Sequence, residues 1–268
     1  MPSHSRFNQL KFWADSAAPF FAYAVLLGLI VPGAFLLPTA AAQNISSVTI
    51  SSPGAGVSDN TPVAANIADF GQEESSPESR KLADWVVDSA DNGKLPFMIV
   101  DKVHARVFVF DAQGQLRGAA SALLGLAVGD DSVPGIGQRK LSSIRPEERT
   151  TPAGRFVASL ARDIKGQEVL WVDYDLAVSL HPVVRGQPRE RRAERLASPS
   201  PADRRISYGC INVPVRFYEK VVSPTFTGTF GIVYVLPETR SARDVFGSYD
   251  VQDSPRKQAS PKLAQANN

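Results

Sequence analysis

Cys210 is the only cysteine of the chain, and it lies in the run Ser207-Tyr208-Gly209-Cys210-Ile211-Asn212. A single cysteine cannot form an intramolecular disulfide, so it needs another use in an exported protein. The preceding glycine and the following Pro214 predict a turn and then the start of a helix. Backbone N–H groups and the helix dipole at such a place favour a thiolate over a thiol. The pattern therefore predicts nucleophilic catalysis by sulfur, with a small buried apolar side chain as the alternative.

Thiol catalysis also needs a base for the proton and donors for the developing oxyanion. The chain has three histidines, His4, His104 and His181. His4 belongs to the N-terminal segment and His104 to a predicted turn, whereas His181 follows a predicted strand in the same half of the chain as Cys210. We therefore predict His181 as the base and the backbone N–H groups of residues 208–210 as oxyanion donors. A hydrogen-bonded, inert histidine at a strand end is the alternative for His181.

Other kinds of site have little support in the sequence. Asn212, two residues after the thiol, is expected to cap the following helix or to bind substrate, with capping favoured. One cysteine and three histidines argue against a zinc site. Gly135-Ile136-Gly137 lacks the rest of a nucleotide-binding fingerprint and predicts a turn. We therefore expect no metal and no cofactor.

Residues 1–42 have the pattern of a secretory signal peptide. Arg6 and Lys11 precede an apolar run from Pro19 to Pro38, and small residues lead to a cleavage point after Ala42. An uncleaved membrane anchor is the alternative, because about 20 apolar residues can span a bilayer. The pattern predicts an exported protein of the periplasm or cell envelope.

The charge balance gives no support to nucleic-acid binding. The formal net charge is +2, and removal of Arg6, Lys11 and Asp15 with the signal peptide takes away one positive charge, which leaves +1. A nucleic-acid-binding surface needs a strong basic field. The remaining chain is long enough for one domain of about 140 to 150 residues, which must rest on an ordinary hydrophobic core.

A linker and a helix are predicted ahead of this domain. Residues 43–76 are rich in Ser, Ala, Asn, Pro and Gly, which is typical of a flexible linker. Ser76 and Pro77 then predict a helix start, as N-cap and first helical residue. Asn92-Gly93 predicts its end. Residues 77–95 are therefore expected to lead into the domain as a helix.

Residues 96–236 are predicted to be mainly β. Short runs of β-branched and aromatic residues alternate with turn residues, which favours a β-sandwich or barrel-like fold with a few short helices over β/α units. A helix is expected after Pro214, with Pro224 as its stop. Residues 237–268 predict a loose polar tail. The predicted strands are 97–100, 105–110, 115–120, 121–128, 155–160, 168–172, 176–180 and 231–236.

Four parts of residues 96–236 resemble, in the same order, the L,D-transpeptidase catalytic domain of the YkuD-like family. Val100-Asp101 to Phe110-Asp111 is similar to its opening hairpin, and Thr151 to Phe156 is similar to its Thr-Pro-x-Gly-x-Phe turn and strand. Leu180-His181-Pro182 stands where the family places its base. Ser207 to Asn212 looks like its signature Ser/Thr-His-Gly-Cys-hydrophobic-Asn or -Arg.

The resemblance implies a β-sandwich-like domain that acts on peptidoglycan stem peptides, with the cysteine in a cleft. Cys210 would attack the carbonyl of the diaminopimelate residue, the third of a tetrapeptide stem, and release the terminal D-alanine. An amine on a neighbouring stem would resolve the thioester and form a crosslink. His181 would act as general base and later as acid. The substrate-binding residues that it implies are Ser207, Tyr208, Gly209 and Asn212.

The acyl acceptor stays open in this interpretation. Besides a stem amine, it could be a D-amino acid, a lipoprotein or water. Water as acceptor would make the protein a cysteine peptidoglycan hydrolase or carboxypeptidase. A third reading, from a different class, is a wall-binding domain that keeps the fold without turnover.

Two features depart from the family pattern. Tyr208 replaces the histidine that usually precedes Gly-Cys, which affects the expected substrate contacts and oxyanion geometry. The stretch between His181 and Cys210 is longer than usual, and seven arginines against three acidic residues give residues 185–205 a net charge of +4. A short helix is expected over Pro188 to Leu196. The stretch is either a solvated surface loop or a basic lid that steers carboxylate-rich stems.

Overall fold

The structure, a computed structural model, describes residues 66–184 and 186–253. The predicted signal peptide or anchor, residues 1–42, lies outside these residues, as does most of the predicted linker. Across the described part of the chain, every helix is too short or too polar to cross a membrane.

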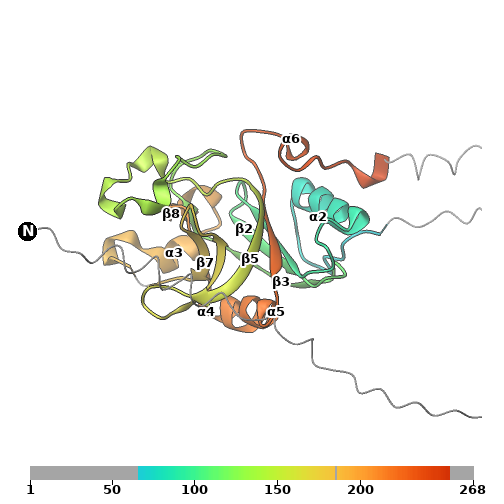
Figure 1. Ribbon diagram of the computed structural model, residues 1–268, viewed down its shortest axis with the longest axis horizontal. Helices are drawn as coiled ribbons and strands as arrows, with labels where there is room; N and C mark the ends of the chain where they lie inside the picture. Colours follow the sequence, from blue (N-terminus) through green and yellow to red (C-terminus); the bar gives the residue numbers. More distant parts are fainter. Residues whose placement is uncertain (1–65, 185, 254–268) are drawn as a thin grey trace, which may run out of the picture. The chain divides into compact units, whose positions relative to one another are not determined.

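Eight strands form one sheet, in the order β3-β2-β1-β10-β5-β6-β7-β9. Figure 1 labels β2, β3, β5 and β7 of this sheet. Neighbours are antiparallel, except that β1 pairs with β10 and β7 pairs with β9 in parallel. The strands are β1 Phe97–Asp101, β2 Arg106–Phe110, β3 Leu116–Ser121, β5 Gly154–Arg162, β6 Glu168–Asp173, β7 Val178–Pro182, β9 Ile211–Val213 and β10 Gly231–Val235.

The two ends of this strand order meet. Leu123, just after β3, exchanges backbone hydrogen bonds of 2.8 and 2.9 Å with Asn212 of β9. β3 and β9 are the first and last strands of the order, so the sheet nearly closes into a barrel. A two-stranded parallel sheet, β4 Leu124–Gly125 with β8 Arg205–Ser207, lies next to this closure. The prediction of a mainly β, sandwich or barrel-like fold with a few short helices is confirmed, and the sheet has the barrel-like form.

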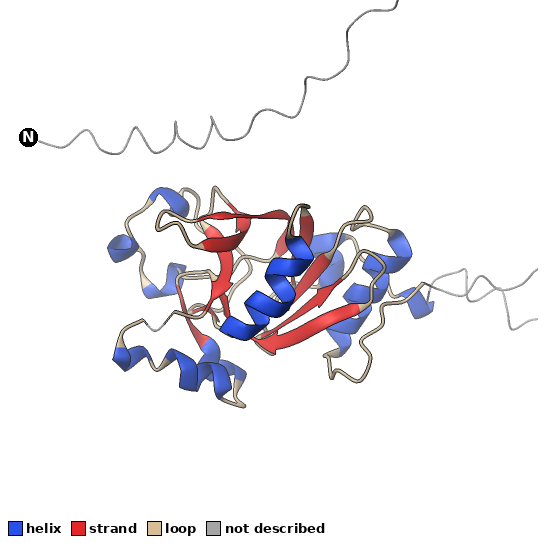
Figure 2. Ribbon diagram, turned by 90° about the horizontal axis from the view of Figure 1, so that it is seen from below, coloured by secondary structure: helices blue, strands red, loops and turns tan. Residues whose placement is uncertain are grey.

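Both faces of the central strands are buried. Val107 and Val109 of β2 belong to one apolar cluster, and Phe108 and Phe110 belong to the other. The first cluster also contains Met98, Leu180 and Ile211, and the helical turns after β9 pack against it. The second lies under α2 Pro77–Ser89. Figure 2 shows the curved strands with helices around them. The alternation of Val and Phe in the sequence of β2 therefore corresponds to the division between two cores.

The helix α2 begins as the sequence predicts. The Ser76 side chain accepts a hydrogen bond from the Ser79 amide, and Pro77 is the first helical residue. It ends earlier than Asn92-Gly93, at Ala90, which has a left-handed φ of 56°. The other short helices are α3 Arg192–Ala197, α4 Val215–Phe217, α5 Ser223–Phe226 and α6 Ala242–Phe246.

Pro224 does not stop the helix that follows Pro214. Helical turns run from α4 through a π-type turn, Tyr218–Val222, into α5, where Pro224 lies in the first turn. A proline in a first turn needs no N–H partner, and the wider turn before it accommodates the interruption.

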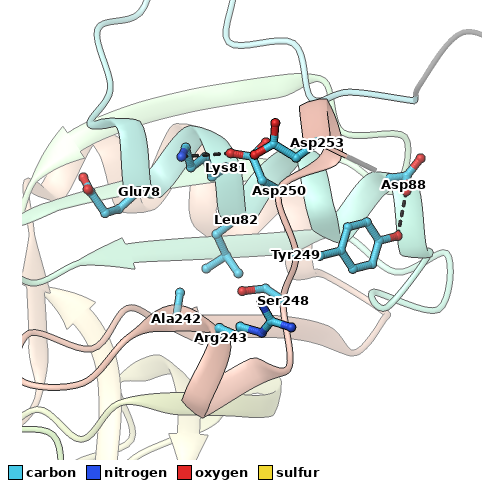
Figure 3. Close-up of a pocket in the computed structure, with 10 residues that line it drawn as sticks. All are labelled: Glu78, Lys81, Leu82, Asp88, Ala242, Arg243, Ser248, Tyr249, Asp250 and Asp253. Carbon is cyan, nitrogen blue, oxygen red and sulfur yellow. Dashed lines mark hydrogen bonds and ion pairs between the residues drawn. The ribbon is translucent and has the colours of Figure 1, made fainter. Parts of the chain in front are cut away.

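The predicted bounds of the linker and of the tail are partly wrong. The end of the linker and the start of the tail pack onto the domain. Phe70 is buried between aromatic rings of β2, and Val251 is buried near α2. Lys81 of α2 pairs with Asp250 at 2.8 Å, and the Tyr249 hydroxyl donates a hydrogen bond to Asp88. Figure 3 draws both contacts. A few apolar residues in a polar background hold these segments, which composition alone does not reveal.

Two further corrections concern strands. The predicted strand 121–128 shrinks to the two residues of β4. β8 and β9 have three residues each and are not predicted from the sequence. Strands this short have too few residues to show a period of two. They flank Cys210, so their positions matter for the site.

Candidate active site

Two adjacent strands bring His181 and Cys210 together. β7 and β9 pair in parallel, with His181 opposite Asn212. Ser179 precedes His181 by two residues, and Cys210 precedes Asn212 by two. Alternate residues of a strand share a face, so these four side chains lie on one side of the sheet. Leu180 and Ile211, between them in sequence, are fully buried in the core on the other side.

The turn before β9 is held by its own hydrogen bonds. Ser207 Oγ donates to the Cys210 carbonyl oxygen at 2.6 Å and accepts from the Gly209 amide at 3.1 Å. Gly209 has a φ of 132°, and a Cβ there would meet the Thr150 carbonyl oxygen at 2.9 Å. Glycine at this position is therefore a steric requirement. The hydroxyl of Ser207, predicted to bind substrate, is used within the turn.

Thr151 joins this turn to the neighbouring chain. Its buried hydroxyl donates to the Gly209 carbonyl oxygen at 2.9 Å and accepts from the Gly125 amide at 2.9 Å. Lys102 Nζ donates to the Thr151 carbonyl oxygen at 3.1 Å. The Thr-Pro segment therefore contacts the nucleophile turn directly, and no local pattern predicts this contact.

The helix-dipole explanation for Cys210 is wrong. β9 follows the thiol, and the helix begins only at Val215. The positive end of a helix dipole acts within about one turn. Asn212 lies within β9 and caps no helix. The electrostatics of the thiol must come from its neighbours on the sheet.

Cys210 lines a cleft of about 900 Å³. Its partly buried sulfur lies 3.7 Å from Ser179 Oγ and 3.6 Å from the Ala177 carbonyl oxygen. Burial by itself raises the pKa of the thiol. The imidazole of His181, as donor and as positive charge, and the amide and hydroxyl of Ser179 outweigh this, so the pKa lies below its ordinary value.

His181 is shifted in the opposite direction. Burial lowers the pKa of its imidazole, but interaction with the Cys210 thiolate and the Pro182 carbonyl raises it above the ordinary value. Nδ1 lies 2.8 Å from the Pro182 carbonyl oxygen, and Nε2 lies 3.3 Å from Asn212 Nδ2. The two side chains therefore favour a thiolate–imidazolium pair, which titrates as a unit.

Asn212 and Arg192 complete this wall of the cleft. Asn212 is 1% exposed, and its Oδ1 accepts a hydrogen bond from Arg192 Nη1 at 2.8 Å. Arg192 Nε is paired with Glu190 at 2.7 Å. Sequence reasoning did not single out Arg192 among the seven arginines of its segment. A Glu two residues before an Arg is too common a pattern to have identified it.

Tyr208 also lines the cleft, and its ring lies 4.0 Å from the Arg149 guanidinium. That cation–π contact occupies one face of the ring. His104, the other histidine within the domain, lies away from the cleft, with Nδ1 2.9 Å from Asp101 Oδ2. Of the two domain histidines, the structure brings only His181 to Cys210.

The Arg-rich segment carries less free charge than its composition suggests. Arg191 pairs with Glu194, and Arg205 pairs with Glu238. Arg204 is buried and donates to the carbonyls of His104, Ala105 and Ser198. Arg185 lies outside the described residues. The helix expected over Pro188 to Leu196 appears as a 3₁₀ turn, Pro188–Glu190, followed by α3.

Neither a second pocket nor a metal-binding group offers a better candidate site in the described residues. A pocket of about 720 Å³ lies beside α2, and its lining residues include no histidine or cysteine (Figure 3). Within residues 66–184 and 186–253, no group of three or more His, Cys, Asp or Glu side chains is arranged to hold a metal ion. The cleft at Cys210 is therefore the candidate active site.

No protein-family model matches the sequence, and no curated protein matches it either. Solved structures do match. The helical cell shape determining protein Pgp2 from Campylobacter jejuni is 14% identical, with a TM-score of 0.37, over 55% of this chain and 49% of that chain. The LD transpeptidase LdtMt1, solved in complex with imipenem, is 15% identical, with a TM-score of 0.32, over 53% and 58%. The catalytic domain of the E. faecium L,D-transpeptidase is 15% identical, with a TM-score of 0.31, over 53% and 98%.

These matches concern the fold. At 14–15% identity and TM-scores of 0.31 to 0.37 the likeness is distant, and the chain spans about half the length of the Pgp2 structure. Identity at this level does not carry an activity from one chain to another. The chemistry of this chain therefore depends on the residues of its own cleft.

Proposed function

We propose that the protein is an exported cysteine L,D-transpeptidase that crosslinks peptidoglycan stem peptides. One observation supports this most directly. Cys210 and His181 lie on one face of adjacent strands in a cleft, and each shifts the pKa of the other toward the thiolate–imidazolium pair. The family resemblance of the surrounding motifs supplies the substrate class. Export by residues 1–42 is part of the proposal, because the stems lie outside the cytosol.

In the first step, the thiolate of Cys210 attacks the carbonyl carbon of the third stem residue and a C–S bond forms. The carbonyl electron pair moves to oxygen, near the amides of Tyr208 and Cys210, because the Gly209 amide already donates to Ser207 Oγ. Collapse of this intermediate breaks the C–N bond to the terminal D-alanine. The leaving nitrogen takes its proton from the His181 imidazolium.

In the second step, an amine of a neighbouring stem attacks the thioester and gives a proton to His181. The C–S bond breaks and the thiolate of Cys210 is restored. An amine and water are both able to perform this step chemically. The same residues would therefore give hydrolysis if water reached the thioester first.

The direct test uses the protein without residues 1–42, its Cys210→Ala variant, and purified tetrapeptide-stem muropeptides. Products are analysed by mass spectrometry. A crosslinked dimer that needs Cys210 is the expected result. Shortened monomers without dimers would assign hydrolysis instead. Binding without any change of product would contradict catalysis and leave a wall-binding domain.

A carbapenem offers a simpler first test, because the resemblance implies acylation of the cysteine by this class. Intact-mass analysis should show one adduct on the protein and none on Cys210→Ala. His181→Gln should slow adduct formation by about 100-fold or more, which is the usual contribution of a general base. His104→Gln is the matched control and should react at the rate of the unmodified protein.

A further inference from the structure

A row of hydrogen bonds runs from the Arg-rich segment to the imidazole of His181. Arg192 Nη1 lies 2.8 Å from Asn212 Oδ1, Asn212 Nδ2 lies 3.3 Å from His181 Nε2, and His181 Nδ1 lies 2.8 Å from the Pro182 carbonyl oxygen. The row joins α3, β9 and β7, which are remote in sequence. Its two ends fix the direction of every bond in it.

At one end, a guanidinium can only donate. The amide atom of Asn212 that faces Arg192 must therefore be the oxygen, and the NH₂ group must face His181. At the other end, a backbone carbonyl can only accept. Nδ1 of His181 must therefore carry a proton toward Pro182. Before Nε2 takes the proton of the thiol, it is therefore the acceptor of the Asn212 N–H, and this bond is lost when the imidazolium forms.

We propose that Arg192 is a positioning residue for the base: by holding Oδ1 of Asn212, it keeps the Asn212 amide donating to His181 Nε2 and opposes protonation of that nitrogen. This inference deepens the proposed function, since it concerns the base of the same site. Without Arg192, the amide of Asn212 could turn over. Its oxygen would then accept from a protonated Nε2 and stabilise the imidazolium.

Burial makes this arrangement effective. Asn212 is 1% exposed, and the side chain of Arg192 is 14% exposed, so water competes little for either group. Glu190 Oε2 pairs with Nε of the Arg192 guanidinium at 2.7 Å, which restricts the motion of the guanidinium. When Nε2 does take a proton, the Asn212 NH₂ group has a second acceptor, the Cys210 carbonyl oxygen at 3.4 Å. The Asn212 NH₂ group can therefore release Nε2 and still keep one hydrogen-bond acceptor.

The proposed effect opposes that of the thiolate. Cys210 raises the pKa of His181. Arg192 lowers this pKa by its positive charge, in addition to its proposed effect through Asn212. An imidazolium stabilised by a thiolate alone would hold its proton too strongly to pass it to a leaving amine. A residue that weakens this hold would keep the base able to act later as an acid.

Other ionisable groups share the cleft with His181 and must be separated from this effect. These are Asp163, Lys165, Glu168, Tyr208, Tyr218 and Glu219. The principal influences on His181 are burial, Cys210, the Pro182 carbonyl and Arg192. Removal of Cys210 therefore leaves Arg192 as the main side-chain influence.

The test is an NMR titration of the imidazole nitrogens in the Cys210→Ala background, where no thiolate titrates with the base. The chain has three histidines, and His181→Gln identifies the resonance. Arg192→Met should raise the midpoint of His181 by about 0.5 to 1 pH unit, the size of one hydrogen bond and a nearby charge. His104, in the same spectrum, should not move.

Two controls separate the hydrogen bond from charge. Arg189→Met removes an exposed arginine of the same segment and should leave the His181 midpoint unchanged. In an Asn212→Ala background, Arg192→Met should shift the midpoint by less than half as much. Arg192→Leu, which likewise has no donor, serves if the Met variant does not fold.

An unchanged or lowered midpoint would overturn the proposal, as would an equal shift in Arg189→Met or a full shift without Asn212. The titration needs no turnover. A protein that made no product could still show the expected shift, and an active protein could fail to show it. Failure of this inference and failure of the proposed function are therefore distinguishable.

Discussion

At the scale of single residues, the environment of the Cys210 sulfur decides its chemistry. Burial opposes ionisation of the thiol, and a thiolate there depends on His181 and Ser179. Gly209, just before it, has a backbone φ of 132°, which residues with a side chain rarely adopt. Reactivity therefore depends on a few groups placed by two strands, and the alkylation of the thiol should report on each of them.

The pH dependence of alkylation follows from the direction of the pKa shifts. Because the pKa of Cys210 is lowered, its reaction with iodoacetamide should begin at a lower pH than that of a free cysteine. In His181→Gln, burial still raises the pKa of the thiol, but the imidazole that lowers it is gone. The midpoint of alkylation should therefore move to higher pH. The measurement is the alkylation rate by mass spectrometry, from pH 5 to 10. His104→Gln should match the unmodified protein, and an unmoved midpoint in His181→Gln would refute the coupling.

At the scale of elements, the site depends on a junction between segments that are distant in the sequence. The turn before β9 and the segment ahead of β5 are connected through the hydroxyl of Thr151. The approach is close, because a Cβ at Gly125 would meet the Arg149 carbonyl oxygen at 2.4 Å. The Thr-Pro segment thus acts on the nucleophile turn by packing and hydrogen bonding.

Thr151→Val keeps the size of the side chain and removes both of these hydrogen bonds. It leaves a buried amide at Gly125 and a buried carbonyl at Gly209 without their partner. The free energy of unfolding should fall by about 1 to 3 kcal/mol, measured by urea denaturation. Thr227→Val, which removes an exposed hydroxyl bonded to the Ser223 carbonyl, should cost less than about 0.5 kcal/mol. Equal losses in the two variants would contradict a special role for the junction.

At the scale of the whole domain, a buried charge cluster connects the sheet to the C-terminal segment. Lys102, fully buried, donates to Asp130 at 2.8 Å and lies 3.6 Å from Glu238. Asp130 accepts from the amides of Glu238, Thr239 and Arg240. Burial would raise the pKa of Asp130, but Lys102 and Thr239 hold it well below its ordinary value. Its contribution to stability is present above the ordinary carboxyl pKa and is lost as the pH falls below it.

Lys102→Met should therefore destabilise the domain strongly. It leaves two buried carboxylates without their central cation, and loss of one partner of a buried pair costs about 3 to 5 kcal/mol. The measurement is urea denaturation at pH 7. Lys81→Met, which breaks an exposed pair with Asp250, is the matched control and should cost at most about 1 kcal/mol. A small loss in Lys102→Met, similar to that of the control, would show that the cluster contributes little.

Local patterns account for much of the fold. Alternation of Val and Phe predicts β2 and its two buried faces, and Ser76-Pro77 predicts the start of α2. These features depend on neighbours in the sequence, so the sequence contains their signal. β8, β9 and the packing of residues 237–253 have no such signal, because contacts with distant segments stabilise them.

For the site, the sequence by itself determined the candidate residues, since one cysteine and two domain histidines leave few choices. It placed the thiol before a helix, and the structure places it before β9. Only the tertiary structure decided that His181 lies beside Cys210 and that Arg192 reaches Asn212. The reason is physical: strand pairing and burial bring together residues that are 29 and 20 positions apart, and no local pattern encodes such a distance.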